Sequence, residues 1–424
     1  MQQRKYRWWG IIALGVSIFL VTTDMTIVAL ALPSIAQYFH LSDSAVSTIV
    51  LSYSLPVTLL VLPVGMVLHR PYPLSAFAGS VVGFGLGSIL CGLAPNFWIL
   101  LLGRMVQGVA GSVMMTQNLA VATALAAPSE RGRAIGIMSS LATLGSVTGP
   151  GIGGLLLGRF GWPSIFFVNV PMCLLAVLLG CVGLRGLTLA EGRTSSNGWR
   201  LMINLLRRPS FFWAWLVILM SSVVSGAFYT LLPFDLSRVQ RLSPGTAGLV
   251  LLCLPFGIAV TAPISGYLTD RLGAKVLMMI GLAFMVGSVG VLTLAVGTRV
   301  SALDLALCLL LVGITRGIFD GPTQTLLMSS DSRETLSAAS SLSAMGRNLG
   351  LALGPLLMSF TWLWMTGLVL QMVGGLLVLD LLTILGFLCG WLSLRAKAQF
   401  PVEALKVDHE GYHGQNTHSR TVIL

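Results

Sequence analysis

The sequence has few charged residues. Only 9% of its 424 residues are Asp, Glu, Lys or Arg, and only 14 are acidic. A soluble domain contains about 25% charged residues, so this composition excludes an ordinary soluble enzyme. Hydrophobic residues make up 55% of the chain, and its mean hydropathy is +0.89. The composition therefore indicates an integral membrane protein.

Motifs for metals, nucleotides and catalysis are also missing. The six cysteines lie in apolar segments, and neither they nor the five histidines have metal-ligand spacing. No Gly-x-x-x-x-Gly-Lys-Ser/Thr sequence is present, which excludes ATP-driven transport by this polypeptide alone. No catalytic constellation is visible, although a membrane-embedded enzyme or sensor is kept as an alternative class. We therefore predict a protein that is not an enzyme and has neither a metal nor a cofactor.

Long apolar stretches follow one another along most of the chain. Each is close to the roughly 20 residues that a helix needs to cross a bilayer. We predict twelve membrane-spanning helices, at 8–33, 43–68, 73–93, 97–121, 133–157, 162–184, 211–235, 245–268, 275–296, 301–327, 336–360 and 365–394. The expected fold class is thus an all-α integral membrane protein.

The basic residues are distributed asymmetrically about these spans. If the amino terminus is cytoplasmic, most of the 25 Lys and Arg residues lie on the cytoplasmic side, whereas only Arg159, Arg238, Arg241 and Arg299 lie outside. This bias predicts a multi-pass protein of the cell (plasma or inner) membrane with both termini in the cytoplasm. It also explains the net charge of +11 without a nucleic-acid partner.

Three sequence landmarks occur twice, in the same order. They are Gly145 to Pro150 with Gly350 to Pro355, Gly65 to Arg70 with Gly266 to Arg271, and Arg104 with Arg316. A repeated order of landmarks indicates two copies of one helical unit. Transporters commonly build their binding site between two such copies.

The duplication predicts how the chain is divided. We expect an N-terminal six-helix bundle at 1–184, a cytoplasmic linker at 185–210, a C-terminal six-helix bundle at 211–395 and a disordered cytoplasmic tail at 396–424. The linker is either solvated throughout or contains a short interfacial helix, since apolar and basic residues alternate in its second half.

Charged side chains inside the spans are the first candidates for function. Each costs about 2.5–3.5 kcal/mol at the bilayer centre, so it normally faces a cavity or a partner. Asp24, once desolvated, could take up a proton, or it could be a packing residue bonded to hydroxyls such as that of Thr23. Arg316 and Asp320 are one helical turn apart, so they form either a simple ion pair or part of a proton or substrate site. Asp380 has no local partner.

Two further arginines and a set of glycines stand out. Arg104 lies in an apolar, glycine-rich segment and needs carbonyls, an amide or a carboxylate nearby, so we expect it to respond to the protonation of an acid. Arg347 could snorkel or bind carbonyls. Small residues permit close helix packing and a proline permits a bend. The glycines and the proline with this pattern are Gly145, Gly149, Pro150, Gly153 and Gly154.

These segments resemble motifs of the major facilitator superfamily, specifically of its drug:proton antiporters. The fifth-span glycines with Pro150 resemble the antiporter motif, which is the most specific of the set. Gly65 to Arg70 resembles the loop motif, and Gly266 to Lys275 resembles its repeat. Arg104 with Gln107 and Gly108 is similar to the motif of the fourth span. Asp24 to Pro33 and Trp162 to Pro171 resemble the branch whose better-known members have fourteen spans.

The chain also departs from the pattern of that family. His69 stands where the loop motif usually has Asp, and Pro71-Tyr72-Pro73 replaces its Gly-Arg-Arg portion. Asp270 and Arg271 keep the usual pattern in the second half. Only the polar stretch at 185–210 occupies the place of the two extra central spans of the fourteen-span relatives.

The resemblance implies a major facilitator fold of two pseudo-symmetric six-helix bundles that rock around a midplane cavity. Proton-coupled export of small amphipathic or hydrophobic compounds is the implied function, with Asp24 and Asp320 alternating between proton and substrate and Arg104 setting the balance. The implied gating residues are Gly65, His69, Arg70, Gly266, Asp270 and Arg271. This function needs Asp24 to reach a water-accessible cavity.

Other readings remain open at this point. The main alternative is a facilitator for a defined metabolite such as a sugar, an amino acid or a siderophore. The expected partners are a small-molecule substrate and the lipid bilayer, with no nucleic acid, and the chain is expected to work as a monomer. A proton gradient supplies the energy. The substrate itself leaves no motif, because drug recognition in such cavities depends on shape and scattered apolar contacts.

Overall fold

The computed structural model of the chain describes residues 2–67, 73–127, 130–185, 198–296, 300–328, 333–365 and 367–395. The secondary structure of these residues is helical. The helices of the first half are α1 (Gln2–Tyr38), α2 (Asp43–Val67), α3 (Pro73–Gly92), α4 (Phe97–Leu125), α5 (Arg131–Phe160), α6 (Ser164–Phe167) and α7 (Asn169–Gly183). Those of the second half are α8 (Gly198–Leu206), α9 (Pro209–Phe234), the π-helical turn η2 (Asp235–Val239), α10 (Pro244–Leu272), α11 (Ala274–Ala295), α12 (Ala302–Leu327), α13 (Arg333–Trp364) and α14 (Leu368–Arg395).

The order of the helices matches the twelve predicted spans. Within the described ranges, ten helical segments are long and apolar enough to cross a membrane. One of them, Ser164–Gly183, combines α6 and α7, and another, Pro209–Val239, combines α9 and η2. The remaining two positions are filled by α2, whose apolar part is Ala45–Val61, and by α13, whose first half is more polar. The predicted all-α membrane fold class is confirmed.

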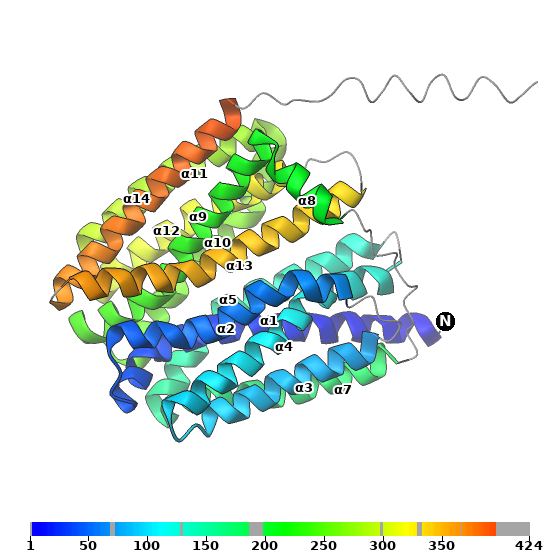
Figure 1. The fold of residues 1–424 in the computed structure, drawn as a ribbon, viewed down its shortest axis with the longest axis horizontal. Coiled ribbons are helices and arrows are strands. Elements are labelled where there is room, and N and C mark those ends of the chain that lie inside the picture. Colours follow the sequence, from blue (N-terminus) through cyan, green and yellow to red (C-terminus); the bar gives the residue numbers. More distant parts are fainter. Residues whose placement is uncertain are drawn as a thin grey trace, which may run out of the picture.

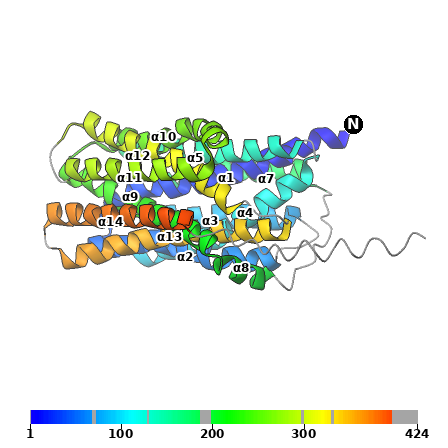
Figure 2. The same ribbon diagram turned by 90° about the horizontal axis from the view of Figure 1, so that it is seen from above.

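Two helical bundles lie side by side, α1–α7 in one and α9–α14 in the other (Figure 1). The view from above shows the helices running along a common direction, as expected for a bilayer-spanning bundle (Figure 2). The bundles diverge toward the end that carries the N-terminus (Figure 1). We call this the N-terminal end and the other the far end.

The packing of buried side chains explains this divergence. At the far end one apolar core runs through both bundles and includes Leu30 of α1, Ile49 of α2, Phe228 of α9 and Trp362 of α13. Toward the N-terminal end the core separates in two. One cluster contains only side chains of the first bundle, and the other contains only side chains of α8, α9, α12 and α13 and their ends. In the described part of the chain, the apolar core that both bundles share therefore lies at the far end.

Close backbone approach strengthens the contact at the far end. A Cβ built on Gly154 of α5 would lie 2.7 Å from the Pro244 carbonyl oxygen and 3.2 Å from the Cα of Gly248, both on α10. At the other end of α5, a Cβ on Gly136 would meet no atom within 4 Å. The pair α5–α10 is therefore tightly packed at one end and open at the other.

Local sequence signals set several helix ends. Asp304 forms a capping box with Ser301 at the start of α12. Asn96 caps α4 by accepting a hydrogen bond from the Ile99 amide at 3.0 Å. Gly273 joins α10 to α11 with a φ of 84°, a left-handed conformation that favours glycine.

Some predictions fall outside the described residues. They include the proposed tail at 396–424, residues 186–197 of the linker, and the loop residues His69 and Arg70. In the second half of the linker, α8 buries Met202 and Leu205 against α9, α12 and α13.

Candidate functional site

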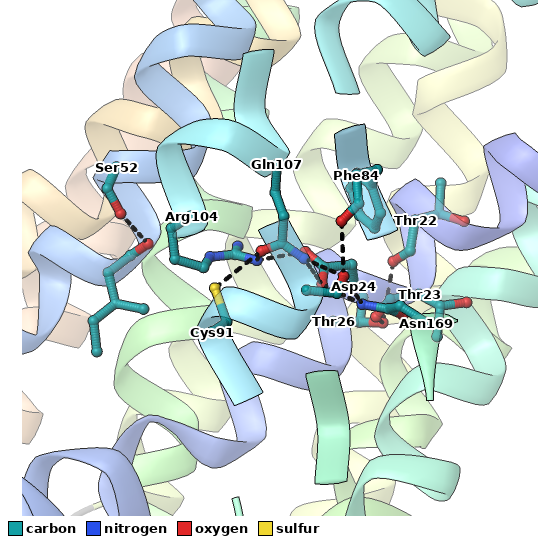
Figure 3. A network of polar contacts seen from close by, with 12 residues as sticks. Thr22, Thr23, Asp24, Thr26, Ser52, Phe84, Cys91, Arg104, Gln107 and Asn169 are labelled. Carbon is teal, nitrogen blue, oxygen red and sulfur yellow. Dashed lines mark hydrogen bonds and ion pairs between the residues drawn. The ribbon is translucent and has the colours of Figure 1, made fainter. Parts of the chain in front are cut away.

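The centre of the first bundle contains a buried ion pair. Arg104 Nη1 of α4 donates to Asp24 Oδ2 of α1 at 2.6 Å (Figure 3). Asp24 has no exposed surface, and Arg104 is 2% exposed. The two costly charges that the sequence singles out in this bundle are therefore each other's partner.

Amide side chains complete the environment of the carboxylate. Asn169, the first residue of α7, donates from Nδ2 to Asp24 Oδ1 at 3.0 Å, and Gln107 Nε2 donates to the same oxygen at 3.4 Å. Gln107 Oε1 also accepts from Arg104 Nη1 at 2.8 Å, because the two residues lie three apart on one face of α4. Ser88 of α3 accepts from Gln107 at 2.8 Å and from Asn169 at 3.3 Å. Four helices thus contribute to one connected network.

Aromatic rings contact the guanidinium of Arg104. Its Cζ lies 4.5 Å from the centre of the Tyr53 ring and 5.9 Å from that of Phe166. Such cation–π contacts become stronger where water is excluded. Within the described structure, Arg104 Nε and the Tyr53 hydroxyl are buried without a hydrogen-bond partner. Loss of one partner of a buried ion pair such as Asp24–Arg104 typically destabilises the fold by about 3–5 kcal/mol, since the other charge is left uncompensated.

The glycines of α5 have two different contact faces. A Cβ on Gly145 would lie 2.6 Å from the Phe19 carbonyl oxygen of α1, and one on Gly153 would lie 2.6 Å from the Ile27 side chain. Gly149 lies between them in sequence and would contact Thr26. This face therefore packs on the helix that carries Asp24. Gly154, in contrast, faces α10 of the other bundle.

The hydroxyls of α1 contribute to that packing. Thr23 Oγ1 donates to the Gly145 carbonyl at 3.1 Å, and Thr26 bonds within its own helix. Thr23 is therefore not the partner of Asp24 that sequence reasoning allowed. Pro150, the next residue of the motif, lines a cavity between the bundles.

In this conformation the cavity is narrow, and its water-accessible volume is about 20 Å³. Its first-bundle wall consists of Thr26, Ala29 and Pro150, and the second bundle contributes Ser225, Phe228, Tyr229, Leu232, Pro233, Leu251 and Leu254. Apolar and aromatic side chains dominate, as in pockets for small organic ligands. Asp24 lies behind the wall, two positions before Thr26, and is sealed from the cavity in this conformation.

The second bundle has its own polar cluster. Arg316 Nε donates to Asp320 Oδ2 at 3.1 Å within α12, and Arg316 Nη1 donates to the hydroxyl of Ser225, a cavity-lining residue. The Arg316 side chain is 14% exposed and that of Asp320 is 36% exposed. The predicted intrahelical ion pair forms, and unlike Asp24–Arg104 it is partly accessible.

Comparison with known proteins identifies the family. Residues 14–355 match the family model described as Major Facilitator Superfamily.

The chain belongs to the major facilitator superfamily.

Similar proteins include the riboflavin transporter RibZ of Clostridioides difficile, which is 28% identical over 82% of this chain and 87% of its own length. The multidrug resistance protein Stp of Mycobacterium tuberculosis is 28% identical over 81% and 74%. The tetracenomycin C resistance and export protein of Streptomyces glaucescens is 26% identical over 82% and 74%. The resemblance to the drug:proton antiporter branch is confirmed, and the family consists of transporters rather than enzymes.

The fold is also found among solved structures. A bacterial homologue of the human lysosomal transporter Spinster, in an inward-facing and unoccupied conformation, superimposes with a TM-score of 0.77 at 19% identity, covering 92% of this chain and 98% of that one. At this identity the likeness shows the major facilitator fold alone.

The remaining candidate residues of this facilitator lie outside the two polar clusters. Gly65 is near the end of α2, while Gly266, Asp270 and Arg271 are exposed near the end of α10. Arg271 lies over the Tyr267 ring, with its Cζ 4.5 Å from the ring centre.

Two of the singled-out charges have partners that the sequence did not reveal. Asp380 of α14 accepts a hydrogen bond at 2.8 Å from Thr293 of α11. It has no partner among its neighbours in sequence, as expected, but it has one on another helix. Arg347 is exposed, and its Nη2 donates to Gln324 Oε1 at 3.4 Å.

Sequence reasoning missed the roles of Asn169, Gln107 and Ser88. Asn169 and Gln107 lie in segments that match family motifs, and each is a polar residue in an otherwise apolar span, where such residues usually bond across helices. That signal was available. The sequence carries no comparable signal for Ser88, because many serines in the spans donate a hydrogen bond within their own helix, as Ser80 does.

Proposed function

We propose that this facilitator exports small amphipathic or hydrophobic compounds in exchange for protons. The main support is the buried network around Asp24, in which the carboxylate is held by Arg104, Asn169 and Gln107 directly behind the wall of the cavity between the bundles. A carboxylate is costly to bury within a membrane span, and residues of this kind commonly take part in proton transfer.

The geometry suggests how proton and substrate are coupled. The α5 glycines pack against α1, which carries Asp24, and Gly154 on the other face packs against α10 of the second bundle. A rocking motion that separates α5 from α10 would therefore act on the helix that holds the carboxylate. We assign the sealed, charge-paired Asp24 to the proton-free state. Proton uptake requires a second conformation in which water reaches it.

Orientation follows from the basic loops. The protein lies in the plasma or inner membrane with both termini in the cytoplasm. The open N-terminal end is then the cytoplasmic one, and the structure is inward-open. The chain would act as a monomer without a nucleic-acid partner, since each chain supplies both bundles around its own cavity.

The proposal is tested in everted vesicles from an efflux-deficient host. Growth on a panel of toxic compounds first selects a transported compound. Adding that compound to energised vesicles should release protons from the lumen, which a pH-sensitive acridine dye reports. Asp24→Asn should abolish this release, whereas Asp380→Asn, whose carboxylate is bonded to Thr293, should retain it. Unchanged proton release with Asp24→Asn at equal expression would refute the assignment.

A second candidate is transport of a defined metabolite. It is favoured by the similarity to a riboflavin transporter. The same vesicles discriminate the two functions, with and without an uncoupler. Broad compound-dependent proton release supports the exporter. Movement of riboflavin or of one other metabolite alone, with no response to the panel, supports the metabolite transporter.

A further inference from the structure

The accessible charges inside the membrane are unequally divided between the two bundles. In the first bundle, Asp24 and Arg104 neutralise one another and have almost no exposed surface. In the second bundle, Arg316 and Asp320 are partly exposed and Arg347 is exposed. Asp380 is bonded to Thr293 between α11 and α14, on the side of the bundle away from the first one (Figure 1). The accessible charges described at this depth are thus two guanidiniums and one carboxylate.

These three groups lie close together. Arg316, Asp320 and Gln324 follow at four-residue intervals along one face of α12. Arg347 reaches this face from α13 through its hydrogen bond to Gln324, and it is near enough to interact electrostatically with both Asp320 and Arg316. A charged side chain exposed at such depth belongs on a water-filled face rather than in hydrocarbon.

The carboxylate of this cluster is already engaged. Asp320 Oδ2 accepts from Arg316 Nε at 3.1 Å, which compensates the charge of Arg316. Among the described residues, the Arg347 guanidinium makes one hydrogen bond, a long one to the neutral amide of Gln324 at 3.4 Å. The cluster therefore carries one uncompensated positive charge, centred on Arg347. Guanidinium groups bind carboxylates, sulfonates and phosphates through paired, charge-assisted hydrogen bonds.

The cluster adjoins the apolar cavity. Ser225 both lines that cavity and accepts a hydrogen bond from Arg316. Tyr229, one helical turn further along α9, lines it too. A ligand with its apolar body against Phe228 and Leu254 would thus have the positive cluster at one edge of its site.

We propose that the substrates of this transporter are amphipathic anions. Their apolar body packs against the side chains that line the cavity between the bundles, in a conformation that widens this cavity, and their anionic group binds Arg347 and Arg316. This inference rests on the proposed export function and specifies its substrate class. Acidic residues inside the membrane would by themselves favour cationic substrates. Here both acids near the cavity, Asp24 and Asp320, are paired with arginine, so the preference is reversed.

Binding of two matched dyes tests the charge preference without any gradient. Fluorescein and rhodamine 123 share a xanthene body, but fluorescein is anionic and rhodamine 123 is cationic. Fluorescence polarisation with the purified protein in phosphatidylcholine nanodiscs should show tighter binding of fluorescein. Arg347→Gln should weaken fluorescein binding about tenfold, as expected for loss of a charge-assisted hydrogen bond, and should not weaken rhodamine 123 binding. Arg347→Lys should keep most of the affinity.

Control variants separate this site from a general charge effect. Arg200→Gln removes an exposed positive charge from α8 and should leave both affinities unchanged. Asp320→Asn should favour fluorescein further and disfavour rhodamine 123. Absence of fluorescein binding, tighter binding of rhodamine 123, or a less than twofold effect of Arg347→Gln would each overturn the proposal. Displacement of fluorescein by phosphatidylglycerol in the nanodisc would assign the site to a lipid headgroup and overturn it as well.

The two proposals fail in distinguishable ways. If the dyes bind as expected but no compound releases protons from energised vesicles, the anion site stands and proton-coupled export does not. If proton release occurs and depends on Asp24, but rhodamine 123 is the preferred ligand, export stands and the anion preference is wrong.

Discussion

Ser359 of α13 donates a hydrogen bond to Ser47 of α2, with 2.5 Å between the two hydroxyl oxygens and both residues buried. The contact joins the two bundles at the far end, within the region where their apolar cores are continuous. It is therefore a direct marker of the closed far end.

Crosslinking at this contact should stop transport. The two hydroxyls are hydrogen-bonded, so the side chains of this pair face each other across the bundles, as the two cysteines of a disulfide must. We expect the double variant Ser47→Cys/Ser359→Cys, after oxidation, to lose transport and to regain it on reduction. The single variants should be insensitive to oxidant. Crosslinking that leaves the transport rate unchanged would show that the far end does not open during the cycle.

A methyl group on Gly154 should open the same end. Its Cβ would approach the Pro244 carbonyl oxygen and the Gly248 Cα of α10, which are backbone atoms that cannot rotate away. Overpacking of this kind costs about 1–3 kcal/mol, so Gly154→Ala should shift the population of open far ends by about 5- to 150-fold.

Labelling of Ser47→Cys by a membrane-impermeant maleimide measures that shift. The rate should rise in the presence of Gly154→Ala. Gly136→Ala is the matched control on the same helix, since a Cβ there meets no atom within 4 Å, and it should leave labelling unchanged. Equal labelling rates in the two backgrounds would contradict the role given to Gly154.

The Asp24–Arg104 pair should show strong energetic coupling. Arg104→Gln leaves a buried carboxylate without its cation and should destabilise the protein by about 3–5 kcal/mol. The double variant Asp24→Asn/Arg104→Gln removes both charges and should recover about half of that loss, because two neutral amides are cheaper to bury. Thermal unfolding in detergent provides the comparison. Additive effects of the two single substitutions would argue against a compensated ion pair.

Asn169 should influence the pH dependence of transport. Its side chain donates to Asp24 Oδ1 at 3.0 Å and so stabilises the ionised carboxylate. Asn169→Ala removes this donor and favours protonation, so the half-maximal point of the transport-versus-pH curve should move to higher pH. Initial rates of compound-dependent proton release, measured across pH, give this midpoint.

The matched control for that experiment is Ser88→Ala, which removes the hydroxyl behind Asn169 but no direct donor to Asp24. It should move the midpoint less than Asn169→Ala does. A midpoint that stays in place for both variants, or that falls with Asn169→Ala, would exclude a direct role of Asn169 in holding the charge.

Several features could be predicted from the sequence alone because they depend on local composition. Apolar stretches of bilayer length predicted the order of the spans, and the repeated landmarks predicted two bundles. Asp24 and Arg104 stood out because a charge in an apolar span is costly wherever the helix lies. The four-residue spacing of Arg316 and Asp320 was sufficient for their ion pair, since a helix places such residues side by side.

Only the tertiary structure decided which distant groups meet. The rotation of α1 against α4 pairs Asp24 with Arg104, and the break between α6 and α7 places Asn169 beside them. Packing likewise gives Asp380 its partner Thr293 and divides the α5 glycines between α1 and α10. Hydropathy shows that a helix is buried in the membrane, but it carries little information about which neighbour each face contacts, because in a lipid environment apolar residues suit both the lipid-facing and the packed side.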